Sequence, residues 1–196
     1  MMISEKYNGK VFIADFTDYV NDPSKEPVEY KGVVVGTEEN GIIPSFVLHN
    51  DNECSIDVIN NERNNALFKR EDGSKVTQCE CIIFADRNDN RKAWMMFLEL
   101  KYCKEKNRYD NMLGGISQLK DTCKYVFKEK KFFEEVTYKK YLVISTPNVE
   151  PLDPFDASYF DQDFMLSVKE ETGAVIKATN EAFIRTPAVI RFESPK

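Results

Sequence analysis

Residues 78–118 read QCECIIFADRNDNRKAWMMFLELKYCKEKNRYDNMLGGISQ and hold two apolar runs separated by a polar turn. They belong to expected strands at residues 76–84 and 93–102, and the turn between them is DRNDNRK. The second run is apolar at both alternating sets of positions, which is typical of a strand covered on both faces of its sheet. We therefore expect two adjacent antiparallel strands, with the rest of the chain organised around them.

A helix and a further strand are expected downstream of this pair. Apolar residues recur at helical spacing between residues 110 and 130, although Gly114 and Gly115 weaken the first turns. Residues 140–146, KYLVIST, then indicate another strand, which a proline ends. The order strand, strand, helix, strand predicts an α/β fold with a mixed sheet, in which the helix crosses over between two strands.

The flanking parts complete what we interpret as a single domain of 196 residues around a core at 76–146. Residues 1–65 are expected to form an N-terminal β element. Its runs with strand character lie at 10–16, 31–37, 41–48 and 55–59. Residues 147–196 are interpreted as an acidic, aromatic loop at 148–165 followed by a C-terminal extension that contains a strand at 188–192.

Composition limits the partners of the chain. The formal net charge of -6 argues against a generally basic nucleic-acid coat, but it allows a local basic groove. Five cysteines without a CxxC pair and a single histidine argue against a zinc site and favour reduced thiols in a cytoplasmic protein. No stretch approaches the roughly 18 apolar residues of a membrane span, so no membrane partner is expected.

Two carboxylates and a lysine are expected to meet at one end of the two central strands. A turn centred between residues 89 and 90 places Glu80 opposite Glu99, and Lys101 lies two positions further on the same face. Opposed carboxylates repel, and a bound cation would relieve that repulsion. Oxygen ligands favour a hard ion such as Mg²⁺, which keeps several waters and meets substrate phosphates. The opposing interpretation is an ordinary strand end with solvated charges.

This combination resembles the PD-(D/E)XK nuclease superfamily, which has the restriction-endonuclease-like fold. The family pattern is an acid on one core strand, acid-x-lysine on the next, and often a helix with a Gln-Leu pair. The matching residues are Glu80 in CECIIF, Glu99 and Lys101 in FLELKYC, and Gln118 in ISQLKDT. The resemblance covers roughly residues 76–146.

The resemblance implies that Glu80, Glu99 and the carbonyl of Leu100 ligate Mg²⁺ or Mn²⁺. Lys101 would assist the attacking water, and Gln118 would help to place the lysine or the water. The substrate would be nucleic acid, DNA more than RNA. Many relatives act as dimers, so a homodimer is one arrangement that the resemblance allows.

The sequence also departs from the family pattern. The first acid is usually Asp, and here Glu80 takes its place with no proline before it. Asp86 is the rival first acid, but six residues of strand, about 20 Å, would carry it into the turn and away from Glu99. The family often adds a helical Glu upstream, and neither Glu53 nor Glu62 lies in a convincing helical pattern.

Charge is unevenly distributed around the expected site. Residues 101–140 hold eleven basic and six acidic groups, whereas 141–171 hold seven acids and one lysine. The basic part suits a passing phosphate backbone, and we expect the acidic part to fold back near it. Two functions follow as hypotheses: a metal-dependent nuclease, or a non-catalytic nucleic-acid- or protein-binding module with the same fold. An unrelated α/β domain is the third alternative.

Overall fold

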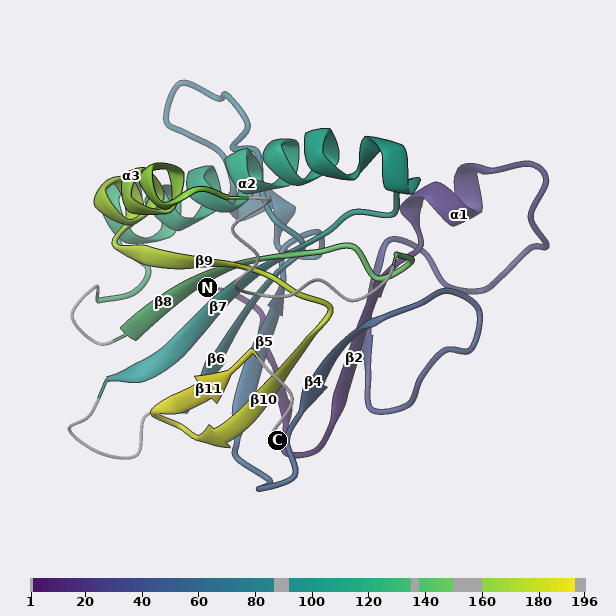
Figure 1. Cartoon of the computed structure of the whole chain (residues 1–196), viewed down its shortest axis with the longest axis horizontal. Helices are drawn as coiled ribbons and strands as arrows, with labels where there is room; N and C mark the ends of the chain where they lie inside the picture. Colours follow the sequence, from purple (N-terminus) through teal and green to yellow (C-terminus); the bar gives the residue numbers. More distant parts are fainter. Residues whose placement is uncertain (1, 87–91, 135–137, 150–159, 193–196) are drawn as a thin grey trace.

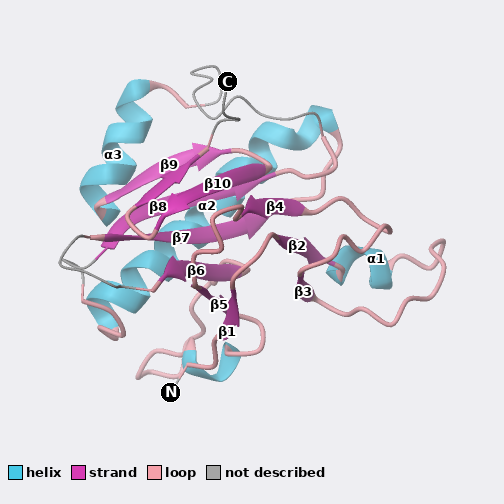
Figure 2. Ribbon diagram, turned by 90° about the horizontal axis from the view of Figure 1, so that it is seen from below, coloured by secondary structure: helices cyan, strands magenta, loops and turns pink. Residues whose placement is uncertain are grey.

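The computed structural model describes residues 2–86, 92–134, 138–149 and 160–192. It has three layers (Figures 1 and 2). Two helices, α2 (Arg108–Lys124) and α3 (Gln162–Thr172), cover one face of a larger β-sheet, and a smaller sheet covers its other face. The chain is therefore an α/β protein with two mixed sheets. No helix in the described ranges is long and apolar enough to cross a lipid bilayer.

The larger sheet is built around the pair of strands expected from the sequence. In spatial order its strands are β1 (Glu5–Tyr7), β5 (Ile56–Asn60), β6 (Cys81–Ala85), β7 (Ala93–Leu100), β8 (Tyr138–Ser145) and β9 (Ala174–Ala178). Strands β1, β5, β6 and β7 pair antiparallel, whereas β7, β8 and β9 pair parallel. Helix α2 connects β7 to β8 and ends in a π-helical turn, η3 (Tyr125–Glu129).

The smaller sheet brings together segments from both ends of the chain. In spatial order its strands are β11 (Val189–Arg191), β10 (Glu181–Thr186), β4 (Phe46–His49), β2 (Val11–Asp15) and β3 (Val33–Gly36). Only β4 and β10 pair parallel. The short elements outside both sheets are α1 (Thr17–Asn21), η1 (Asn65–Leu67) and η2 (Glu105–Asn107). Residues 1–65 thus contribute strands to both sheets and do not form a separate element.

Strand β7 divides the hydrophobic core into two parts. Met95 and Phe97 pack in the layer under α2, together with Ile116 and Leu119 of that helix. The alternating set of β7, which includes Trp94, packs between the two sheets. All eight residues of β7 are buried, which confirms the expectation of a strand covered on both faces.

Two sequence expectations differ from the structure. Part of the segment interpreted as a loop is helical, because α3 begins within it at Gln162. The Asp161 side chain caps that helix by accepting a 2.7 Å hydrogen bond from the Phe164 amide, and Gly173 ends it with a φ of 69°. Strand β6 starts at Cys81 and not at residue 76, because Gln78 and Cys79 before it bond to side chains of α2.

Glu62, which follows β5 of the larger sheet, forms a hydrogen bond with the edge strand β3 of the smaller sheet. Its carboxylate accepts a 2.9 Å hydrogen bond from the Val33 amide, while the Asn60 side chain donates to the Val33 carbonyl at 2.8 Å. Gly32, with a φ of 58°, lies directly against Glu62, so a β-carbon there would collide with the carboxylate. The unpaired groups of an edge strand are therefore satisfied by side chains at this point.

We predict that Gly32→Ala destabilises the protein more than Gly41→Ala. Both glycines have positive φ, at 58° and 68°, so both substitutions carry the backbone cost of about 1–2 kcal/mol. Only Gly32→Ala also displaces Glu62, because nothing lies within 4 Å of a β-carbon at Gly41. Loss of the Val33 hydrogen bond adds roughly 1 kcal/mol. Equal midpoints of the two variants in urea would contradict the role given to Glu62.

Candidate functional site

The expected register of the two central strands is confirmed. Cys81 pairs with Leu98 and Ile82 with Phe97, so the next step of the ladder sets Glu80 opposite Glu99. Ile82 and Phe97 both face α2, and Glu80 and Glu99 have the same parity along their strands. Both acids therefore lie under the helix layer, at the end of β7 that leads into α2.

Helix α2 packs closely on this end of the sheet at Gly115. A β-carbon at Gly115 would lie 3.1 Å from Cγ of Glu99 and 3.4 Å from Cε of Lys101, and it would collide with Ile144 of β8. Both glycines lower the intrinsic stability of the helix, but Gly115 is required by close packing. The glycine allows the helix backbone to cover the acid and the lysine directly.

Glu99 and Lys101 form a close ion pair in a buried place. The Lys101 ammonium lies 2.5 Å from Oε1 of Glu99, and the side chain of Glu99 has no exposed surface, whereas 25% of the Lys101 side chain is exposed. The Lys101 ammonium and the Glu80 backbone are the donors near this carboxylate, which has room for about four hydrogen bonds. A buried carboxylate with unused acceptor positions is a group that a cation or a donor from a ligand could satisfy.

Burial raises the pKa of both acids. Desolvation and the charge of Glu99 raise the pKa of Glu80 to about 9. Desolvation also raises the pKa of Glu99, while the ammonium of Lys101 opposes that shift. The two carboxylates therefore share an environment that holds a proton tightly, as opposed acids in a sheet should.

Gln118 and the Leu100 carbonyl occupy supporting positions. The Gln118 side chain donates to the carbonyl of Gln78 at 3.4 Å, so it contacts the segment that enters β6. Leu100 pairs with Ser145 of β8, and its side chain is buried. Asp86, the rival first acid, lies at the other end of β6, where it bonds to Lys6 at 2.7 Å.

The second sheet adds residues that sequence reasoning missed. Asp15, the last residue of β2, contributes negative charge that raises the pKa values of Glu80 and Glu99. Tyr102 receives the Asp15 amide at 3.3 Å and donates its hydroxyl to the Pro44 carbonyl at 2.8 Å. No local pattern in the sequence points to Asp15, because its place beside the acids depends on how the two sheets pack.

Neither a metal-ligand cluster nor a known relative identifies the site. Within the described ranges, no group of three or more His, Cys, Asp or Glu residues is arranged to hold a metal ion. Compared with known proteins, the chain matches no family model, no curated protein and no solved structure. The site must therefore be interpreted from its own geometry.

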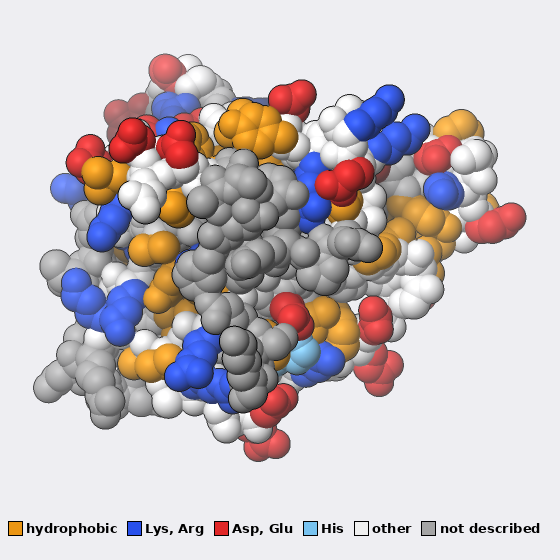
Figure 3. All heavy atoms as spheres, in the orientation of Figure 1, with side chains coloured by type: hydrophobic (Ala, Val, Ile, Leu, Met, Phe, Trp, Pro, Cys, Tyr) orange, Lys and Arg blue, Asp and Glu red, His pale blue; other side chains and the backbone are white. Residues whose placement is uncertain are grey.

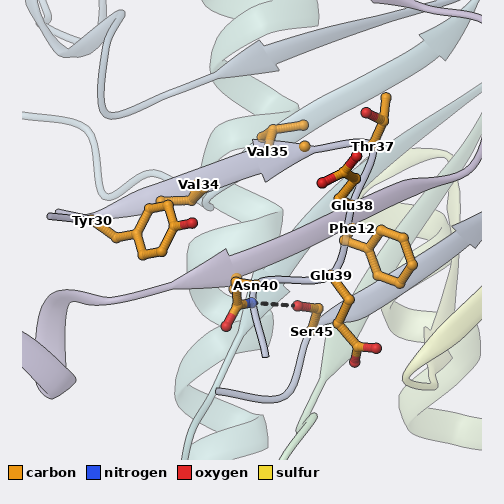
Figure 4. Close-up of a pocket in the computed structure, with 11 residues that line it drawn as sticks. Phe12, Tyr30, Val34, Val35, Thr37, Glu38, Glu39, Asn40 and Ser45 are labelled. Atoms are coloured by element: carbon orange, nitrogen blue, oxygen red, sulfur yellow. Dashed lines mark hydrogen bonds between the residues drawn. The ribbon is translucent and has the colours of Figure 1, made fainter. Parts of the chain in front are cut away.

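A hollow of about 340 Å³ lies away from these acids, beside β2 and β3 of the smaller sheet (Figure 4). Asn40 and Ser45 on its border are joined by a 3.0 Å hydrogen bond. Its lining residues are Phe12, Ala14, Tyr30, Val34, Val35, Gly36, Thr37, Glu38, Glu39, Asn40 and Ser45. None of the candidate catalytic residues contributes to it.

The basic stretch after β7 is neutralised at one end. Lys120 and Lys124 of α2 both form ion pairs with Glu171 of α3, and the Lys128 ammonium donates to the Glu171 carbonyl at 2.9 Å. Glu171 belongs to the acidic segment that we expected near the basic one, and that expectation holds for this residue. Glu150, Asp153 and Asp156 of the same segment lie outside the described residues.

We predict opposite effects for alanine at the two adjacent glycines of α2. Gly114→Ala has open space around its β-carbon and should stabilise the helix by about 0.5–1 kcal/mol. Gly115→Ala forces the helix away from Glu99 and Ile144, at a cost of roughly 1–3 kcal/mol. Urea unfolding of both variants measures the difference, and a neutral Gly115→Ala would contradict the close packing.

We predict that Glu80→Gln stabilises the protein increasingly as the pH rises. Because the folded pKa of Glu80 is raised to about 9, the folded state binds more protons than the unfolded state above the ordinary pKa, so wild-type stability falls between about pH 4.5 and pH 9. Glutamine removes that loss. The melting temperature of Glu80→Gln should exceed that of the wild type by several degrees more at pH 9 than at pH 5.

The control for this pH dependence is Glu38→Gln, which removes a carboxylate at an exposed position. Its melting temperature, relative to that of the wild type, should stay nearly constant across the same pH range. If Glu80→Gln shows the same shift at pH 5 and pH 9, the buried acid pair is not present as described.

Proposed function

We propose that this protein hydrolyses phosphodiester bonds in nucleic acid with the help of Mg²⁺ or Mn²⁺. The observation that carries the proposal is the meeting of Glu80, Glu99 and Lys101 at one sheet end beneath α2, with the Glu99 carboxylate buried and open to further partners. A buried ion pair usually costs stability, so its presence here points to a role other than stability.

The order of the elements supports this reading. Strands β5, β6 and β7 form an antiparallel series, α2 follows, and β8 returns parallel to β7. The acid-x-lysine at the end of β7 follows the PD-(D/E)XK pattern, whereas Glu80 lies one residue before β6 and not on the strand. The restriction-endonuclease-like fold is therefore part of the proposal, as are the roles of Leu100 and Gln118.

The residues present fit a divalent cation. Glu80 and Glu99 offer oxygen atoms only, which suits a hard ion, and the Glu99 carboxylate keeps acceptor positions beyond its contact with Lys101. A bound Mg²⁺ would polarise a phosphate oxygen and lower the pKa of a water molecule. The Leu100 carbonyl, at the last position of β7, is the third oxygen proposed for this set.

Lys101 supplies the charge that the reaction needs on the protein side. Its ammonium is fixed by Glu99 and partly exposed, so it can donate a hydrogen bond to an attacking water while it offsets negative charge on the phosphate. Gln118 is a positioning residue, because its hydrogen bond to the Gln78 carbonyl holds the segment that carries Glu80. Gly115 keeps the helix close enough to limit water around the pair.

A non-catalytic nucleic-acid-binding module is the second candidate function. The observation in its favour is that Glu99 has no exposed surface, so a substrate phosphate cannot reach it without movement of its cover. Glu80 in place of the usual Asp points the same way. The two candidates share a binding surface and differ in whether a metal binds and a bond is cut.

We predict that Lys101→Ala abolishes hydrolysis but retains metal binding, whereas Glu99→Ala loses both. The reason is that Lys101 contributes charge and a donor, a kind of contribution worth about 10²–10³ in rate, while Glu99 is a ligand. Hydrolysis should be assayed on single- and double-stranded DNA and RNA with Mg²⁺ and Mn²⁺, and metal binding measured by calorimetry. A wild-type protein that binds neither metal at millimolar concentration and cleaves no substrate is not this enzyme.

A further inference from the structure

The positive charge beside the site is distributed in a way that the sequence did not reveal. Lys120 and Lys124, in the second half of α2, are neutralised by Glu171. By contrast, Lys104 and Lys106, at the start of the helix, are exposed and form no ion pair with any described residue. Figure 3 shows Lys and Arg side chains gathered at the end of α2 that lies next to α1.

The acid within this segment does not cancel those charges. Glu105 is bound to the buried guanidinium of Arg108 at 3.2 Å, and the same guanidinium donates to Thr146 beyond β8 at 3.3 Å. Glu105 is thus neutralised from inside the protein. Within residues 104–110 the other acid is Asp110, so this stretch carries two lysines without ion pairs against one such carboxylate.

An exposed aromatic ring stands beside the two lysines. Half of the Tyr109 surface, 50%, is exposed, and its ring contacts no other ring in the described parts of the chain. Lys106 and Tyr109 are three residues apart across the junction of η2 and α2, a spacing that places side chains on one side of a helix. Exposed aromatics among lysines are the means by which proteins hold single-stranded nucleic acid.

The position of this segment relative to the acids is fixed by α2. Six residues of helix separate Tyr109 from Gly115, which corresponds to about 9 Å along the axis. Gly115 lies against both Glu99 and Lys101. A strand that contacts the segment is therefore within a short step of the ion pair.

We infer that Lys104, Lys106 and Tyr109, the 104–109 surface, bind a single strand of nucleic acid and lead it to the acid pair. The lysines contact phosphates and the Tyr109 ring stacks on one base. This inference rests on the proposed function and deepens it, because it names single-stranded nucleic acid, or an unpaired end, as the preferred substrate. A duplex keeps its bases stacked inside and gains only the phosphate contacts.

The test is a binding measurement in EDTA, where no hydrolysis takes place. A fluorescein-labelled 20-nucleotide dT strand, the same strand annealed to its complement, and a U-rich RNA strand are titrated with protein at several salt concentrations. Lys104→Ala/Lys106→Ala should weaken binding of all three and lower the slope of log K against log salt by about 1.4 for single strands. Tyr109→Ala should weaken single-strand binding roughly five- to hundredfold and duplex binding much less.

Two control variants make the result specific. Lys69→Ala/Lys75→Ala removes the same charge from exposed positions on another part of the surface and should leave affinity within about twofold. Tyr109→Phe keeps the ring and should bind like the wild type. An equal loss in both lysine pairs, unchanged binding by Tyr109→Ala, or a wild-type protein that binds none of the probes at low salt each overturns the inference.

The outcome is separable from that of the proposed function. Binding through the 104–109 surface without any metal-dependent cleavage would retain this inference and reject the hydrolase. Cleavage that is unaffected by all of these variants would retain the hydrolase and reject this surface as the route of the strand.

Discussion

The packing at the end of the sheet that leads into α2 depends on the buried carboxylate of Glu99. Its charge has lost its water and is opposed by the ammonium of Lys101 at 2.5 Å. Desolvating such a pair costs several kcal/mol per ion, so an apolar side chain would serve stability better there. Two features allow the pair. Gly115 leaves room for it under α2, and the Lys101 side chain is partly exposed to solvent.

The two residues that follow the end of β7, Lys101 and Tyr102, anchor it to the two neighbouring layers. Lys101 lies against α2, whereas Tyr102, one position later, turns to the smaller sheet and joins Pro44 and Asp15 there. The chain that carries the ion pair is thus anchored to the layers on both sides of the larger sheet. Fixed groups of this kind need little reorganisation when charge appears beside them, which is the physical basis of electrostatic catalysis.

The central hairpin and its acids were predictable because local rules decide them. Side-chain alternation and turn length fix the register that opposes Glu80 and Glu99, and two-sided burial follows from the apolar run of β7. The smaller sheet was not predictable, because β4 and β10 pair across some 130 residues and no local pattern selects their partners. Asp15 was missed for that reason. Gly115 was seen only as a weak helix former, since its reason lies in residues of other strands.

The lysines along α2 and the segment before it are neutralised unevenly, so positive charge is left near the start of the helix. An overall charge of -6 repels a polyanion at a distance. Glu171 neutralises Lys120 and Lys124 in the second half of α2, whereas Lys104 and Lys106 form no ion pair with the described residues. If the proposed function holds, these two lysines would attract a nucleic acid toward the end of the sheet that carries the acids, over a Debye length of about 8–10 Å. Orientation therefore precedes any chemistry, and it would operate equally in a hydrolase and in a binding module. What separates the two is whether the cover over Glu99 can yield to a metal and a phosphate.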